Sequence, residues 1–306
     1  MIEQSMVELP HGITLSCRTA GERGRPVLMF LHGFPEAAFV WDHLLEHFAQ
    51  AQHGGYRCIA PNLRGFEKSS APPEVEAYRA QLLVQDITAL IAVEGGRLDC
   101  LIAHDWGGAP AWSLANQHPQ LLQRLAIINS PHAGTFQREL SNSPAQQAAS
   151  AYMNFLIRPD AEKLLAEDDF RRLREFFFRL GAADGPNAWW TPEVEQQYRE
   201  VWQAGLTGPL NYYRATPLRP PHAEDPGAAG VQLPRAWLTV DVPTLVLWAM
   251  DDIALPPALI DGLDDYVKDL ELHRIEQATH WIVHEKPDVV IGYLTTFMGN
   301  PVNYIK

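Results

Sequence analysis

The chain has 306 residues, and 46% of them are hydrophobic, so it can bury a large core. This composition excludes an intrinsically disordered protein and a small domain held together by disulfides. The net charge of −13 at pH 7 disfavours nucleic acid and anionic membrane surfaces as partners, so we expect a small-molecule partner that is neutral or cationic.

Three cysteines, Cys17, Cys58 and Cys100, are scattered along the chain and form no CxxC pair. We therefore expect reduced, buried thiols, neither disulfides nor zinc ligands. The first ten residues lack the apolar core of a signal peptide, and no stretch reaches the roughly 18 apolar residues of a membrane span. These features predict a cytoplasmic protein that does not enter a membrane.

Strand-like and helix-like segments alternate in the first half of the chain, as in α/β proteins whose mostly parallel central sheet is flanked by helices. Each expected strand is a short apolar run followed by a loop rich in Gly, Pro, His or Asp, so it delivers side chains at its carboxyl end. The expected strands are 27–31, 57–60, 100–103, 125–128, 244–250 and 272–275, and the expected helices are 82–93, 109–115 and 289–297.

The middle of the chain, residues 133–235, shows no strand pattern and predicts helices rich in Glu, Arg, Gln and aromatic residues. A proline-rich stretch from Pro217 to Pro234 connects it back to the next strand. At about 150 residues per domain the length allows two domains. We expect a core domain formed by 1–132 and 236–306, with 133–235 inserted as a helical cap, or lid.

Residues 100–115 read CLIAHDWGGAPAWSLA, an apolar strand, a sharp turn and a helix that opens with Gly107 and Gly108. This is the pattern of a nucleophile elbow, in which the tight turn leaves no room for large neighbours. Asp105 stands at the apex, and a carboxylate there indicates displacement at a strained or halogenated sp³ carbon. The alternative is that Asp105 only caps the helix, which would require neither the glycine pair nor the preceding strand.

Together with the nucleophile elbow, five further motifs make the sequence similar to proteins of the α/β-hydrolase fold. Within that fold, it resembles the soluble epoxide hydrolases. The motifs are LHGFPE at 31–36, NLRGFEKSS at 62–70, AHDWGG at 103–108, GPLNYYR at 208–214, AMDDIALP at 249–256 and THW at 279–281. They span nearly the whole chain in the order of the family. Two positions depart from it, because Asn62 stands where Asp is usual and Glu67 where Gly is common, which we interpret as altered packing.

The order of the motifs agrees with a catalytic triad, since in this fold the nucleophile is followed by an acid and then a histidine, each in a loop after a strand. The resemblance implies Asp105 as nucleophile, His280 as the general base that activates water, and Asp252 as the acid that orients His280. Asp251 is the neighbouring alternative for the acid. His284 is a weaker candidate for the base and is expected to be a surface or capping group.

The resemblance also implies the groups that bind reacting oxygen atoms. The backbone N–H groups of Phe34 and Trp106 would form an oxyanion hole, with a cis peptide bond between Phe34 and Pro35. Tyr213, and with a looser motif Tyr152, would donate hydrogen bonds to the epoxide oxygen, because a phenol keeps its proton at pH 7. Tyr212 would face elsewhere.

The expected substrate is an apolar epoxide that reacts with water, and the resemblance implies no metal or organic cofactor. Aromatic residues expected to line the substrate pocket are Phe34, Trp106, Phe155, Trp189 and Trp190. The polar residues Glu36, His104 and His132 are assigned structural hydrogen bonds only. Neither a monomer nor a homodimer is excluded.

Two other functions are compatible with the motifs. A haloalkane or haloacid dehalogenase uses the same Asp and His, but it would need a second N–H donor for the halide beside Trp106, such as Trp189, Trp190 or Trp202. A catalytically silent α/β-hydrolase homologue that only binds a ligand is the more remote alternative, because it would not need the complete set of reactive groups.

Overall fold

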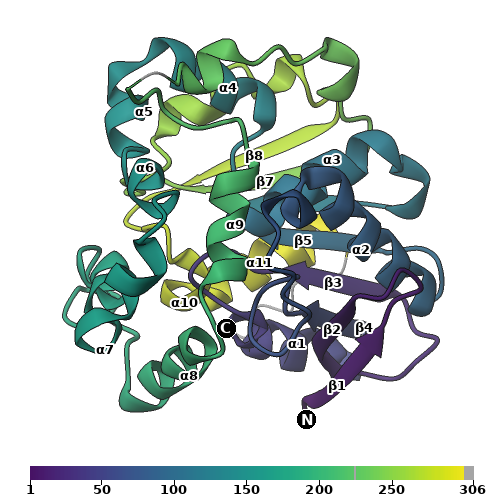
Figure 1. The fold of residues 1–306 in the computed structure, drawn as a ribbon. Helices are drawn as coiled ribbons and strands as arrows, with labels where there is room; N and C mark the ends of the chain where they lie inside the picture. Colours follow the sequence, from purple (N-terminus) through teal and green to yellow (C-terminus); the bar gives the residue numbers. More distant parts are fainter. Residues whose placement is uncertain (224, 300–306) are drawn as a thin grey trace.

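The computed structural model describes residues 1–223 and 225–299, and within them an eight-stranded sheet has the order β1-β2-β4-β3-β5-β6-β7-β8 (Figure 1). The strands are β1 (Glu3–Glu8), β2 (Thr14–Ala20), β3 (Val27–Leu31), β4 (Arg57–Pro61), β5 (Cys100–His104), β6 (Leu125–Ile128), β7 (Thr244–Ala249) and β8 (Leu270–Ile275). β1 and β2 are antiparallel to their neighbours, and the other neighbouring pairs are parallel. This is the mostly parallel sheet that the sequence predicts.

All six predicted strands are present, and β3 and β6 have the predicted ends. β1 and β2 were not predicted from the sequence. β1 is exposed along nearly its whole length, so it has no apolar run, and its register comes from antiparallel pairing with β2. The five central strands, β3 to β7, are buried at every position, and the three cysteines are free and buried, as predicted.

Helices cover both faces of the sheet. α2 (Ala80–Val93) packs on α3 (Gly108–Gln117), and α1 (Asp42–Ala49) packs on α11 (Pro287–Phe297) on the opposite face, as Figure 1 shows. α2, α3 and α11 begin one or two residues before their predicted starts, whereas α1 and the short α10 (Ile282–Glu285) were not predicted. Among the described residues, no helix has the length and apolar character needed to cross a bilayer.

Residues 133–235, called the helical segment below, leave the sheet after β6 and return to it at β7. Their helices are α4 (Ala133–Asn142), α5 (Pro144–Ala149), α6 (Tyr152–Leu156), α7 (Ala161–Phe178), α8 (Pro192–Gln203) and α9 (Thr207–Ala215). The segment has no strand among its described residues, as predicted. α7 is interrupted at 167–170, where three consecutive residues have left-handed φ values of 51° to 60°. Figure 1 shows α9 running between the sheet and the other helices of the segment.

One contact between the helical segment and the rest of the chain is made by two glycines. Gly208, in the first turn of α9, packs on Gly65 in the loop after β4, and a Cβ on Gly208 would lie 2.5 Å from the Gly65 Cα atom. No side chain fits between two backbones at this separation. The contact therefore fixes how closely α9, and with it Tyr213, approaches the sheet.

We predict that Gly208→Ala destabilises the protein by about 1–3 kcal/mol, the usual effect of forcing a methyl group into a filled contact. Thermal unfolding of both proteins checks this. Gly292→Ala is the matched control, since Gly292 lies in α11 and an added Cβ there has open space. Its unfolding temperature should stay level or rise. Equal unfolding temperatures for Gly208→Ala and the wild type would contradict the predicted backbone contact.

Candidate active site

Asp105 stands in a tight turn between β5 and α3. Its φ of 48° lies in the left-handed region, which Asp tolerates better than most residues. Three glycines surround the turn because a Cβ on Gly33 would collide with the Asp105 side chain, on Gly107 with the Leu31 carbonyl, and on Gly108 with the Ser130 side chain. The carboxylate does not cap the helix, since it accepts the backbone N–H of Phe34 at 2.7 Å.

His280 lies between two carboxylates. Its Nδ1 atom is 2.7 Å from Asp252 Oδ2, and its Nε2 atom is 3.5 Å from Asp105 Oδ2. His280 comes from the loop after β8, and Asp252 from the loop after β7, so the carboxyl ends of parallel strands bring the three side chains together. Asp251, the alternative acid, is exposed. The geometry therefore assembles the three residues that the sequence predicts.

Asp252 is fully provided with hydrogen-bond donors. Its Oδ1 atom accepts the backbone N–H groups of Ala254 and Leu255, both at 2.9 Å, and its Oδ2 atom accepts the Asn129 side chain at 2.8 Å in addition to His280. Burial by itself would raise the pKa of Asp252, but the His280 charge and these hydrogen bonds outweigh it and lower the pKa. Asp252 is thus an ionised, fixed partner for the imidazole.

Asn129 was missed by the sequence reasoning. It follows β6 with a φ of 39°, donates to Asp252 and accepts the Ala249 backbone N–H at 2.8 Å. The only feature of the sequence that pointed to Asn129 as a site residue was its position directly after a predicted strand, which is the position that Asp105 occupies after β5.

The electrostatics of His280 favour the protonated imidazole. Burial by itself would lower the pKa of His280, but the negative charge of Asp252 and the hydrogen bonds with Asp105 and Asp252 raise it well above its usual range. The imidazolium is therefore stabilised while both carboxylates are ionised. Loss of either negative charge would lower the pKa of His280.

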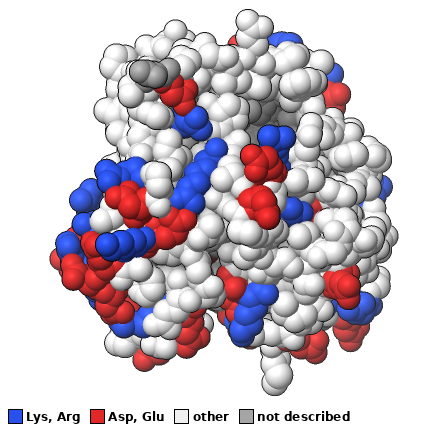
Figure 2. Space-filling view, viewed as in Figure 1, with Lys and Arg blue, Asp and Glu red and all other residues white. Residues whose placement is uncertain are grey.

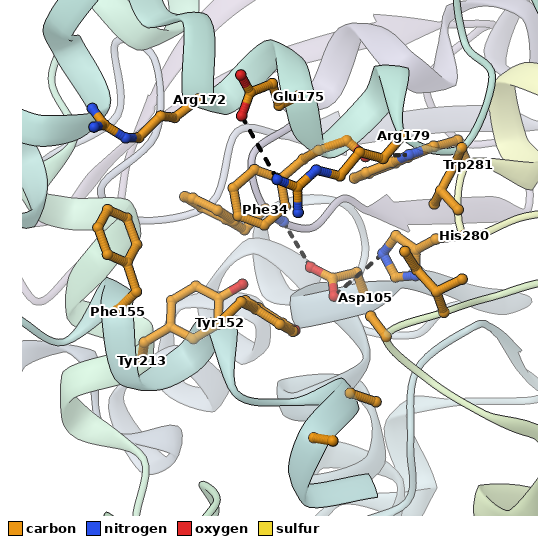
Figure 3. A pocket seen from close by; sticks show the side chains of 16 residues that line it. Phe34, Asp105, Tyr152, Phe155, Arg172, Glu175, Arg179, Tyr213, His280 and Trp281 are labelled. Carbon is orange, nitrogen blue, oxygen red and sulfur yellow. Dashed lines mark hydrogen bonds and ion pairs between the residues drawn. The ribbon is translucent and has the colours of Figure 1, made fainter. Parts of the chain in front are cut away.

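Two phenols, the buried Tyr213 and the half-buried Tyr152, face Asp105 across a cavity of about 550 Å³ (Figure 3). Tyr152 comes from α6 and Tyr213 from α9, and their ring centroids are 6.1 Å apart. Burial raises the pKa of both hydroxyls well above the usual value, so both remain protonated. Tyr212 points the other way and donates its hydroxyl to the Arg64 carbonyl at 2.9 Å, as predicted.

The cavity has an aromatic wall, but its lining differs from the prediction. Phe34 and Phe155 line it as expected, whereas Trp106, Trp189 and Trp190 do not. Trp106 packs edge-on against Tyr213, with ring centroids 5.0 Å apart. The remaining members of the lining are Ala148, Ala149, Arg172, Glu175, Phe176, Arg179, Leu180, Ile253, Ala254 and Trp281.

The prediction for Trp189 and Trp190 was wrong because Tyr198 and His284 draw these indoles into a separate aromatic cluster. Trp189 stacks on His284 at 3.9 Å between ring centroids, and Trp190 stacks on Tyr198 at 5.2 Å. Trp281 lines the cavity instead. Its place directly after His280 was the one signal in the sequence that could have found it.

A buried polar cluster lies behind His280. Glu36, with no exposed surface, is 3.0 Å from the Nδ1 atom of His104, and the Nε2–H group of His104 donates to the His280 carbonyl at 2.9 Å. His284 is not the surface group that was expected, since its Nε2 atom lies 2.7 Å from the buried Tyr198 hydroxyl. His132, in a different place, donates to the Leu238 carbonyl at 2.8 Å. His104 and His132 thus bind backbone carbonyls, and Glu36 binds the His104 side chain, which are structural hydrogen bonds of the kind that the sequence predicts for Glu36, His104 and His132.

Only one of the two expected oxyanion-hole donors contacts the Asp105 carboxylate. The Phe34–Pro35 peptide bond is cis, as predicted, and the Phe34 amide already donates to the carboxylate. Within the described residues, no hydrogen bond joins the Trp106 amide to that carboxylate, and its role stays a prediction. No group of three or more His, Cys, Asp or Glu side chains in the described part of the chain could hold a metal ion.

Comparison with known proteins gives a consistent set of relatives. Residues 26–287 match the α/β-hydrolase fold family. The chain is 33% identical to the AB hydrolase superfamily protein YfhM of Bacillus subtilis (strain 168), over 95% of this chain and 96% of that protein. It is 31% identical to epoxide hydrolase 4 of Mus musculus, over 94% of this chain and 77% of that protein.

Solved structures agree with these sequence matches. An epoxide hydrolase of Bacillus megaterium in complex with an inhibitor superimposes with a TM-score of 0.86 at 28% identity, covering 97% of this chain and 100% of that one. A structure described as one of the novel epoxide hydrolases of the α/β-hydrolase superfamily in metagenomes from hot environments gives a TM-score of 0.84 at 37% identity, covering 98% and 100%.

Because Asp252 supplies the nearest negative charge to His280, we predict that Asp252→Asn lowers the pKa of His280. Titration of the imidazole by NMR measures this directly. Asp251→Asn removes the same charge one residue away, on an exposed side chain, and should leave the titration of His280 where it is. If the two variants shifted His280 equally, its charge would not depend on the 2.7 Å contact.

Proposed function

Since the chain belongs to the epoxide hydrolase family of the α/β-hydrolase fold, we propose that it converts an apolar epoxide and water into a vicinal diol. The observation that carries this proposal is a carboxylate at the apex of a nucleophile elbow, facing two protonated tyrosines across one cavity (Figure 3). A nucleophile and a pair of acids on opposite sides are what opening of a strained three-membered ether requires.

In the first step an oxygen atom of Asp105 attacks an epoxide carbon. The carbon–oxygen bond of the ring breaks, and an ester of the Asp105 side chain forms. Tyr152 and Tyr213 donate hydrogen bonds to the departing ring oxygen, and one of the two supplies its proton. These tyrosines belong to the helical segment, which we therefore propose to be a cap that completes the active site.

In the second step His280 takes a proton from water, and the resulting hydroxide attacks the carbonyl carbon of the ester. The oxyanion that forms accepts the N–H groups of Phe34 and, in our proposal, Trp106. The ester bond then breaks, the proton of the attacking hydroxide passes to the leaving alkoxide, and Asp105 is restored as the carboxylate. Protonated His280 returns its proton through solvent to the tyrosinate left by the first step, and the diol leaves. Asp252 holds the ring of His280 in place and stabilises the imidazolium.

The charges at the site suit this order of events. Ester formation removes the negative charge of Asp105, one of the groups that raise the pKa of His280. The pKa of His280 therefore falls once the ester has formed, and the imidazole releases its proton more readily when it is needed as a base. The rate of ester hydrolysis should fall as the pH drops through this lowered pKa, because protonated His280 cannot accept a proton.

No observation favours a dehalogenase. That function would need an indole N–H beside Trp106 to hold the halide, but Trp202 donates its N–H group to the Pro35 carbonyl at 2.8 Å. Trp190 donates to Glu195 at 3.3 Å, and Trp189 lies in the aromatic cluster on His284. A silent ligand-binding homologue would not require the hydrogen-bonded arrangement of Asp105, His280 and Asp252.

We predict that His280→Gln accumulates the ester, because attack on the epoxide needs no base whereas hydrolysis does. After incubation with styrene oxide, intact-protein mass spectrometry should show the added mass of one substrate, and peptide mapping should place it on Asp105. His273→Gln is the matched control, since His273 on β8 pairs with Glu271 and does not line the cavity. An unmodified His280→Gln protein, or an adduct elsewhere, would refute the covalent scheme.

We also predict that Tyr152→Phe and Tyr213→Phe each slow ester formation on the order of 10²-fold, the usual effect of removing one donor from a developing oxyanion. Single-turnover kinetics with styrene oxide measure this step. Tyr212→Phe is the control, because it removes a neighbouring hydroxyl that bonds to Arg64 outside the cavity. It should lose about 1 kcal/mol of stability and keep the wild-type rate. Equal rates in all three variants would contradict the assigned proton donors.

A further inference from the structure

The mouth of the cavity is charged, although its deeper wall is aromatic. Three charged side chains of the lining, Arg172, Glu175 and Arg179, come from the second half of α7 and the residue that follows it. The other titratable groups of the lining are Asp105 and His280 at the reacting end and the two protonated tyrosines, Tyr152 and Tyr213. When a substrate is bound at Asp105, the end of it that is remote from the epoxide therefore lies beside these three side chains.

At this mouth, the guanidinium of Arg179 makes no hydrogen bond to any described residue. Its one polar contact is an ion pair with Glu175 Oε2 at 3.8 Å, and 74% of its side chain is exposed. Neighbouring arginines are committed to closer acceptors: Arg171 to Glu175 at 2.9 Å, Arg172 to the Leu164 carbonyl at 2.6 Å and Arg174 to Glu195 at 3.0 Å. Figure 2 shows basic and acidic side chains interleaved over this part of the molecule.

The close-up in Figure 3 shows how the two lining arginines differ. Arg172 points its guanidinium away from Asp105, toward its own acceptors. Arg179 extends across the cavity above Phe34, with its guanidinium between Glu175 and the catalytic end. Its planar N–H groups are thus available to a group on the substrate, and carboxylates match that geometry best.

We infer that the site prefers aromatic epoxides whose ring carries a carboxylate, and that Arg179 is the residue that selects them; this inference rests on the proposed epoxide hydrolase activity. The aromatic wall of Phe34, Phe155 and Phe176 takes the ring, and Arg179 takes the anion. Glu175 is the competing carboxylate for Arg179, although its other oxygen is already held by Arg171.

The test compares two epoxides of nearly the same shape, para-glycidyloxybenzoate and para-glycidyloxybenzamide. In the wild type, kcat/KM for the carboxylate should exceed that for the amide about two- to fivefold, the range for an exposed ion pair. Arg179→Gln should bring the ratio near one, Arg179→Lys should keep part of it, and Glu175→Gln should increase it. Added salt should reduce the preference, since the contact is open to solvent.

Arg174→Gln is the control for net charge, because it removes one positive charge from α7, close to Arg179 in the chain, at a residue that does not line the cavity. Its ratio should equal that of the wild type. A wild-type ratio of one or less, or a ratio unchanged in Arg179→Gln, would overturn the inference while leaving the epoxide hydrolase function intact. Failure with styrene oxide would instead refute the proposed function. In that event, calorimetry with the two diols still tests whether Arg179 selects the carboxylate.

Discussion

The left-handed backbone at Asp105 turns the chain from β5 into α3 and leaves a carboxylate standing above the carboxyl ends of the strands. Such a conformation costs on the order of 1–3 kcal/mol for a residue with a side chain. Two hydrogen bonds hold it, from the Ser130 hydroxyl to the Asp105 carbonyl at 2.6 Å and from the Phe34 amide to the carboxylate at 2.7 Å. The glycines around the turn are required because the adjoining loops pack directly onto it.

This turn also sets the charge balance of the site. A carboxylate at this place lies 3.5 Å from His280, whose other nitrogen is held by a buried and ionised Asp252. The imidazole thus has a negative neighbour on each side, and one of those neighbours is consumed by the proposed ester. The net charge of −13 therefore has little influence on the protonation of His280. The charges of Asp105 and Asp252 dominate, because they lie a few ångströms from the imidazole and are shielded from water.

The sequence was sufficient for six of the eight strands and for the placement of Asp105, Asp252 and His280 at one edge of the sheet, because buried strands are apolar runs and each of these residues lies in a loop that follows one. It was not sufficient for β1, whose polar residues are ordered only by pairing with β2, nor for the indoles of the helical segment. Which way Trp189 and Trp190 point depends on Tyr198 and His284, which are remote in sequence from each other, and local patterns carry no such information. The role of Asn129 could not be predicted for the same reason, because it depends on contacts with residues that are remote in the sequence.

Asn62 and Glu67, the two positions that depart from the family pattern, are explained by a contact between their side chains. Glu67 adopts a φ of 52°, a conformation that explains why Gly is common there. Its carboxylate accepts the Asn62 side chain at 3.1 Å and the Lys68 backbone N–H at 2.8 Å. The two substitutions are thus partners. An Asp at 62 would place a second negative charge against Glu67, so the amide at 62 and the acid at 67 suit one another.

The contacts between the helical segment and the rest of the chain concern both proposed chemical steps. Gly208 on Gly65 sets the height of α9 and therefore of Tyr213, which belongs to the opening of the epoxide. Trp202 donates to the Pro35 carbonyl and so holds the loop that carries the Phe34 amide, which belongs to hydrolysis of the ester. A disturbance of this interface would impair both steps together, whereas a disturbance at Asn129 would reach only the step that depends on Asp252 and His280. The two half-reactions can thus be separated by where the structure is perturbed.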